Sequence, residues 1–236
     1  MDGLKLENVT PTLSVYQKKG VFSYGTDAVL LANYTLSFYK SLKNKKVLDL
    51  CSGTGIIPLL MCDKNKDLTA VALEVNKDAC EIAKMSAEYS SLSDRVSVIC
   101  SDLNEHKALF SPESFDFITC NPPYMTADCG KMCVDDYKTI ARHEILCNIN
   151  DIFKAAFYLL PTGGSIYIVY RPDRLSSLFK AASDNRFEIK DLTVIETTTV
   201  PCNCKLILCK ASKDSSEGVK LSISDIDNII NKEEKN

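Results

Sequence analysis

The chain has 236 residues, of which 45% are hydrophobic and 25% are charged, and its formal net charge is −3. This composition is ordinary for a globular protein with one α/β domain or two small ones, and the net charge alone does not indicate a nucleic-acid-binding protein. No run approaches the roughly 18 apolar residues of a membrane span, and the first residues lack the apolar centre of a signal peptide, so we expect a cytoplasmic protein that is not membrane-bound.

The N-terminal segment, residues 1–45, precedes the first predicted strand. Within it, residues 22–39 place apolar side chains at helical spacing, and Thr26 or Asp27 is positioned to cap that helix. Residues 1–46 carry seven basic residues against three acids, namely Lys5, Lys18, Lys19, Lys40, Lys43, Lys45 and Lys46 against Asp2, Glu7 and Asp27. The excess predicts either a local basic face or an ordinary solvated surface.

From Lys46 onward, strands and helices are predicted to alternate. The strand patterns lie at 46–50, 68–74, 95–100, 115–120, 165–170, 187–196 and 204–211, and the helix patterns at 55–62, 76–90, 148–160 and 172–183. Such alternation predicts an α/β domain with a mostly parallel sheet and helices on both faces. The last two strands have a short connection, which favours an antiparallel hairpin. We therefore expect a seven-stranded domain over 46–211 and a polar, frayed tail over 212–236 that holds a short helix near 222–231.

The sequence VLDLCSGTGIIPLL, residues 47–60, reads as a strand, a glycine turn and a helix. Gly53 and Gly55 allow a tight turn and the close approach of a ligand. Glu74 ends the next strand, near the roughly 20-residue offset at which an acid meets ribose hydroxyls. A dinucleotide fingerprint needs a third glycine where this chain has Pro58, and Asp49 disfavours a pyrophosphate. A cationic cofactor without phosphate, S-adenosyl-L-methionine, suits both acids.

Asn121-Pro122-Pro123-Tyr124 follows the predicted strand FDFITC and resembles the catalytic motif of enzymes that methylate planar amino or amide nitrogens. An exocyclic amine is a poor nucleophile, because its lone pair is delocalised into the ring, and it needs acceptors for both of its hydrogens. The Asn121 side-chain oxygen and the Pro122 carbonyl supply two acceptors, and the prolines hold them rigid. Tyr124 offers a flat face for the target ring. The alternative is a plain proline-rich turn.

The motif order resembles that of class I methyltransferases over roughly residues 20–211, which implies a Rossmann-like fold and S-adenosyl-L-methionine as cofactor. DLCSGTG looks like the family's D-x-x-x-G-x-G loop, with Cys51 where many members carry a further glycine. Asp102 resembles the acid that accepts from the cofactor's adenine amino group, with Leu103 beside the ring. The cofactor site implied by the resemblance is Asp49, Cys51, Ser52, Gly53, Gly55, Glu74, Val75, Asp102, Leu103 and Asn121.

Three further stretches are most similar to the bacterial tRNA(Val) adenine-N6-methyltransferase family, namely YGTDAVLLANY (24–34), ARHE (141–144) and LILCKASK (206–213). This resemblance implies an RNA substrate, tRNA in particular, and no obligate protein partner. It adds Tyr24, Thr26 and Asp27 to the cofactor site, with helix capping as the alternative for the last two. Lys131, Arg142 and His143 follow the Asn-Pro-Pro-Tyr motif and are candidates for contact with the RNA.

Other substrates and roles stay open. By resemblance, the same motif serves guanine N2 in ribosomal RNA and a glutamine amide in release factors, although residues 1–45 are too few for the helical domain that the glutamine enzymes usually carry. A non-catalytic cofactor- or RNA-binding scaffold is the alternative from another class. The cysteines, including Cys129, Cys133, Cys202 and Cys204, lack paired zinc spacing, so we expect free thiols and no metal.

Overall fold

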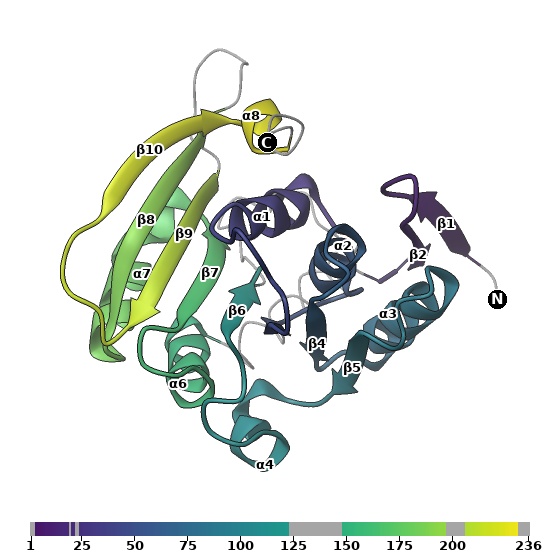
Figure 1. Cartoon of the computed structure of the whole chain (residues 1–236), viewed down its shortest axis with the longest axis horizontal. Coiled ribbons are helices and arrows are strands. Elements are labelled where there is room, and N and C mark those ends of the chain that lie inside the picture. The colour runs from purple at the N-terminus through teal and green to yellow at the C-terminus, as the bar shows by residue number, and fades with distance from the viewer. Residues whose placement is uncertain (1–2, 19, 22–23, 123–147, 197–205, 231–236) are drawn as a thin grey trace.

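The computed structural model describes residues 3–18, 20–21, 24–122, 148–196 and 206–230. It begins with an antiparallel hairpin of β1 (Leu4–Asn8) and β2 (Ser14–Lys18), which sequence analysis did not predict. The hairpin lies beside helix α3 (Figure 1), where the Ser86 hydroxyl accepts from the Tyr16 backbone N–H at 2.9 Å. Polar hydroxyls of the helix thus satisfy the backbone groups of β2.

The central sheet confirms the predicted α/β class. Its order is β10-β8-β9-β7-β6-β3-β4-β5, and β9 is antiparallel to both β7 and β8, while the other neighbours are parallel. The strands are β3 (Lys46–Leu50), β4 (Thr69–Glu74), β5 (Val96–Cys100), β6 (Phe117–Cys120), β7 (Ser165–Tyr170), β8 (Phe187–Glu196), β9 (Leu206–Lys213) and β10 (Lys220–Asp225).

Helices cover both faces of the sheet, as expected (Figure 1). They are α1 (Thr26–Leu36), α2 (Ile56–Lys64), α3 (Lys77–Tyr89), α4 (His106–Leu109), α6 (Ile149–Leu159), α7 (Leu175–Asp184) and α8 (Ile226–Ile230), with short 3₁₀ turns η1 (Leu103–Glu105) and η2 (Pro172–Arg174). Asn76 caps α3 by accepting from the Ala79 N–H at 3.1 Å, and Pro58 lies in the first turn of α2, where its missing N–H costs nothing.

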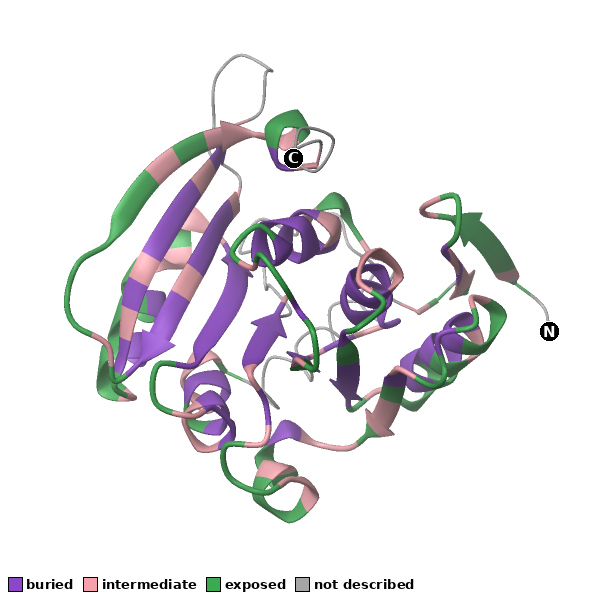
Figure 2. Ribbon diagram, viewed as in Figure 1, coloured by how far each residue is buried: buried purple, intermediate pink, exposed green. Residues whose placement is uncertain are grey.

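Two hydrophobic cores form because successive side chains of a strand point to opposite faces. Val47 packs with α1 and α2 in one core, and Leu48 packs with α6 and α7 in the other. Figure 2 shows the buried residues concentrated on the inner strands. None of the helices in the described part of the chain has the length and apolarity that a membrane crossing requires.

The C-terminal part of the chain corrects two predictions. The sheet has eight strands rather than seven, because residues 220–225, expected in a frayed tail, form β10 beside β8. β9 also continues to Lys213, beyond the expected end at 211. The hydroxyl groups of Ser222 and Thr193 lie 2.8 Å apart across the β8–β10 pair. Leu221 and Ile223 are each 68% exposed, so the strand gains its order from edge pairing rather than from core burial.

The start of α1 contradicts the alternative that Thr26 or Asp27 caps this helix. Gly25, and not Thr26 or Asp27, occupies the N-cap position, and no side chain caps this helix. Asp27 instead lies in the first turn of α1, where a carboxylate interacts favourably with the helix dipole. Its Oδ1 accepts from the Ala28 backbone N–H at 3.0 Å. Its Oδ2 is therefore available to a different element of the fold.

Candidate active site

The site lies where the strand order reverses. The chain runs from β3 outward through β4 to β5, and then returns to β6 on the other side of β3. In open α/β sheets, such a reversal leaves a crevice at the carboxyl ends of the two strands. Leu50 and Cys120 are register partners, so Cys51 and Asn121 begin the two loops that flank this crevice. Neighbouring strands are about 4.8 Å apart, which brings the predicted glycine loop and the catalytic motif together.

The glycine loop, residues 51–55, has the shape that the sequence predicted. Gly53 and Gly55 adopt positive φ angles of 56° and 79°. A Cβ on Gly55 would stand 3.0 Å from the Ala83 Cβ, tighter than an ordinary contact, so glycine lets α2 pack closely against α3. Cys51, in place of the further glycine of many family members, takes the left-handed conformation at φ 56°. The loop therefore keeps its fold at a cost of about 1–2 kcal/mol for that residue.

Glu74 fastens the glycine loop to the end of β4. Its Oε2 accepts from the Gly53 N–H at 2.8 Å, and its Oε1 accepts from the N–H groups of Val75 at 3.0 Å and Asn76 at 2.9 Å. The side chain is buried. A carboxylate offers about four lone-pair sites, so these bonds use most of its capacity. Glu74 thus shapes the loop in addition to the ligand contact predicted for it.

Asp49 lies beneath the loop and not on its surface. Its carboxylate is fully buried and accepts from the hydroxyls of Ser52 at 2.5 Å and Thr119 at 2.6 Å. It therefore ties β3 to both the glycine loop and β6. Burial, with the nearby Glu74 charge, raises the pKa of Asp49 to about 7, although the two hydrogen bonds act in the opposite direction. The predicted contact with a ligand ammonium stays a prediction.

This buried acid predicts a pH-dependent stability. The folded-state pKa of about 7 lies above the ordinary value of 3.8, so between those pH values the native state holds a proton that the unfolded chain has released. The free energy of unfolding is therefore expected to fall as the pH rises through this window. Asp49→Asn, which stays neutral, is expected to reduce the fall between about pH 5 and pH 7 by about 1–3 kcal/mol.

Urea unfolding at the two pH values measures the effect. The exposed Asp78 of α3, substituted in the same way, serves as the control, because its side chain lies at the surface and outside the glycine loop. An Asp49→Asn protein whose stability depends on pH as steeply as that of the wild type would contradict the prediction.

The residues after β4 and β5 continue the same edge of the sheet. Val75 is 37% exposed beside the buried Glu74. Asp102 is half-buried and accepts from the Asn104 backbone N–H at 2.8 Å, which caps η1, while Leu103 is buried beneath it. The exposed Val75 side chain and the Asp102 carboxylate follow neighbouring strands. Together they are suited to a flat ring that carries an amino group.

Two residues of the Asn-Pro-Pro-Tyr motif are described. Asn121 is half-buried, and its amide nitrogen donates to Asp27 Oδ2 at 3.2 Å. Pro122 is buried. The other predicted residues in this region, namely Pro123, Tyr124, Lys131, Arg142 and His143, lie outside the described residues, as do Cys129, Cys133, Cys202 and Cys204.

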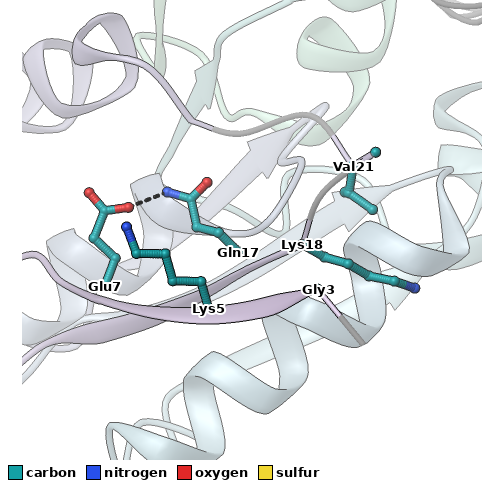
Figure 3. Close-up of a pocket in the computed structure, with 7 residues that line it drawn as sticks. Gly3, Lys5, Glu7, Gln17, Lys18 and Val21 are labelled. Carbon is teal, nitrogen blue, oxygen red and sulfur yellow. Dashed lines mark hydrogen bonds between the residues drawn. The ribbon is translucent and has the colours of Figure 1, made fainter. Parts of the chain in front are cut away.

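Tyr24 connects α1 to the N-terminal hairpin. Its hydroxyl lies against Glu7 and Gln17, and burial together with the Glu7 charge raises the pKa of Tyr24 to about 12. Glu7 and Gln17 also line an open pocket of about 420 Å³ along the hairpin, where the Gln17 amide donates to Glu7 at 2.6 Å (Figure 3). None of the described residues lining this pocket was predicted for cofactor binding. Thr26 is exposed at the start of α1.

Sequence reasoning missed two contacts of the site. Thr119, on β6, holds Asp49 from the neighbouring strand, and Asp27 contacts Asn121 across 94 positions of the chain. A polar residue at a fully buried strand position is the signal that indicates Thr119. No local pattern indicates the contact between Asp27 and Asn121, because it depends on how α1 packs against the sheet.

Comparison with known sequences finds similarity to methyltransferases. The sequence model of the methyltransferase small domain family matches residues 12–180. A tRNA1(Val) (adenine(37)-N6)-methyltransferase of Bacteroides thetaiotaomicron is 30% identical over 185 residues, which make up 77% of this chain and 74% of that protein. A release factor glutamine methyltransferase of Clostridium acetobutylicum is 32% identical over 126 residues, 53% of this chain and 44% of that protein.

The fold is also shared with a solved structure. A predicted O-methyltransferase, protein Atu636 from Agrobacterium tumefaciens, has a TM-score of 0.67 to this chain at 18% identity, over 87% of this chain and 95% of that one. That identity shows the fold alone, which is the predicted Rossmann-like methyltransferase fold. The family match covers the glycine loop, Glu74, Asp102 and Asn121. The chain therefore belongs to the methyltransferase small domain family.

Proposed function

We propose that this chain transfers a methyl group from S-adenosyl-L-methionine to the exocyclic N6 amine of an adenine in tRNA. The observation that carries the proposal is the position of Asn121 and Pro122 at the carboxyl end of β6, directly across the crevice from the glycine loop. The name of the Bacteroides thetaiotaomicron relative, which aligns over three quarters of this chain, supports the adenine and the tRNA.

The residues around the glycine loop fit this cofactor. No described atom lies within 4 Å of the point where a Gly53 Cβ would stand, so the surface over the loop is open to a ligand. Glu74 and Asp102 place carboxylates at the ends of neighbouring strands, as hydroxyl and amino groups require. Val75, which is exposed directly after Glu74, offers an apolar surface. When bound, the cofactor supplies a methyl group on a positively charged sulfur.

The chain's own part in the reaction is positioning. The Asn121 carbonyl oxygen and the Pro122 carbonyl accept the two hydrogens of the adenine amine, so that its nitrogen becomes pyramidal and directs its lone pair at the methyl group. The same two acceptors stabilise the positive charge that develops on this nitrogen, which is where preorganised polar groups contribute most. After transfer the nitrogen carries a positive charge and releases its extra proton to water, so the site needs no strong base.

The RNA must present its target base unstacked, and a tRNA loop does so at little cost. We propose that the N-terminal segment, residues 1–45, closes over the cofactor and the target, and that Lys131, Arg142, His143 and Tyr124 contact the RNA. The glutamine amide of a release factor is the second candidate. It is supported by the Clostridium acetobutylicum relative, although the match covers less than half of that protein.

A methyl-transfer assay tests the proposal. The purified chain is incubated with radiolabelled S-adenosyl-L-methionine and, separately, total tRNA, ribosomal RNA or a release factor. Nuclease digestion of the labelled product is expected to give N6-methyladenosine from tRNA only. Label in the release factor would establish the glutamine amide as the target, and label in ribosomal RNA would establish guanine N2. Cofactor binding without transfer to any substrate would favour a non-catalytic scaffold.

A further inference from the structure

The first turn of α1 contacts the catalytic motif directly. Asn121 Nδ2 donates to Asp27 Oδ2 at 3.2 Å, although the two residues lie 94 positions apart. A carboxylate only accepts hydrogen bonds, so it admits only the NH2 end of the amide. Turning the amide over would place two acceptors against each other. The contact therefore fixes which end of Asn121 faces away from α1.

We propose that Asp27 is a positioning residue for the methyl-transfer reaction, because it holds the Asn121 amide with its carbonyl oxygen turned toward the substrate amine. The inference rests on the proposed function, in which that oxygen is an acceptor. It also gives Asp27 a role different from the cofactor contact expected from the sequence. Asp27 acts through Asn121, so it is not itself a catalytic residue.

The carboxylate of Asp27 is held in place by its surroundings. Its Oδ1 accepts from the Ala28 backbone N–H at 3.0 Å, which leaves Oδ2 directed at Asn121. Helix α1 is anchored behind it by the buried Leu30 and Leu31. The Tyr34 hydroxyl donates to the buried Asp191 of β8 at 2.7 Å. The sheet thus fixes the helix, and the helix fixes the carboxylate.

Gly25 provides the room that this arrangement needs. A Cβ on Gly25 would stand 2.6 Å from Asp27 Oδ1, which is closer than two such atoms can approach. The backbone of Gly25 is extended, at φ −107°, so alanine is accommodated there without backbone strain. Gly25→Ala is therefore expected to displace the Asp27 carboxylate while the helix stays folded. This variant tests whether the carboxylate must be in position, whereas Asp27→Ala tests whether it must be present.

The first test compares single variants in steady-state methylation of tRNA. Asp27→Ala and Gly25→Ala are each expected to lower kcat by about 10- to 100-fold, the range for losing a hydrogen bond to a charged group. The dissociation constant of S-adenosyl-L-methionine is expected to change less than about twofold. Asp78→Ala removes an exposed first-turn acid from α3 and is the matched control, with kcat unchanged. Wild-type kcat in Asp27→Ala would overturn the inference.

The second test is a double-mutant cycle with Asn121→Ala. If Asp27 acts through Asn121, Asp27→Ala lowers kcat by less than about twofold in the Asn121→Ala background, since the two residues work as a unit. Equal losses in both backgrounds, or a weakened cofactor affinity in both, would show that Asp27 binds the cofactor instead. An Asn121→Ala protein that keeps full activity would overturn the proposed mechanism itself, which is a different result.

A third readout does not depend on turnover. In ¹H–¹⁵N spectra of the wild-type protein, the side-chain NH2 signals of Asn121 are identified by their loss in Asn121→Ala. These signals are expected to move in Asp27→Ala and in Gly25→Ala, and to stay in place in Asp78→Ala. Unmoved signals in the first two variants would overturn the inference, even if no substrate for the wild-type protein had been found.

Discussion

Asn121→Ala is expected to lower the rate of methyl transfer by about 100- to 1,000-fold, the cost of removing one preorganised polar group from a transition state. The substitution takes away one of the two acceptors for the target amine, and the nitrogen can then become pyramidal only at a higher energy. Cofactor affinity is expected to change little, because Glu74, Val75 and Asp102 lie at the carboxyl ends of β4 and β5, away from the end of β6. Single-turnover methylation of tRNA and cofactor titration by calorimetry measure the two quantities separately.

The control for this variant is Asn228→Ala, which removes an exposed asparagine from α8. Thermal unfolding of both variants shows whether either loses its fold. Asn121 is half-buried, so its truncation is expected to cost at most about 1–2 kcal/mol of stability. Turnover within about threefold of the wild-type rate would contradict the role of Asn121 as an acceptor and would favour the proline-rich turn considered from the sequence.

Much of the fold was predictable because its signals are local. The apolar run KVLDL, the glycine turn and the following helix lie within 20 residues of one another, and the structure has them as β3, the loop and α2. The first β-hairpin and β10 were not predicted, because their sequences are polar and their order comes from neighbours far along the chain. β10 pairs with β8 across more than 20 residues, and no periodicity in KLSISD reveals that partner.

The site was predictable in a different way. The strand ends indicated which residues meet at one edge of the sheet, and the structure brings the glycine loop, Glu74 and Asn121 together there. The hydrogen bonds that each side chain makes at that edge were harder to predict. For Asp49, the sequence predicted a ligand contact but did not indicate the hydrogen bonds that its carboxylate accepts from Ser52 and Thr119 inside the fold. Hydrogen-bond partners depend on strand order, which the residue pattern of a single strand does not contain.

Glu74→Gln is expected to weaken the binding of S-adenosyl-L-methionine by about 10- to 100-fold, through loss of hydrogen bonds to a charged group. The amide has the size of the carboxylate, but only one of its two ends accepts hydrogen bonds. Whichever way it turns, its NH2 faces either the Gly53 N–H or the N–H groups of Val75 and Asn76, all of which the carboxylate now satisfies. The glycine loop must then move, and the cofactor loses both an acceptor and a shaped surface.

The same conflict is expected to lower the free energy of unfolding by about 1–3 kcal/mol, the cost of leaving a buried donor unpaired. Equilibrium dialysis with labelled cofactor and urea unfolding measure the two effects. Glu81→Gln makes the same change at an exposed position of α3 and is expected to alter neither quantity. Because the loop is fastened by Glu74 before any ligand arrives, the two losses should appear together. A Glu74→Gln protein with weakened cofactor binding and unchanged stability would show that Glu74 contacts the ligand without shaping the loop.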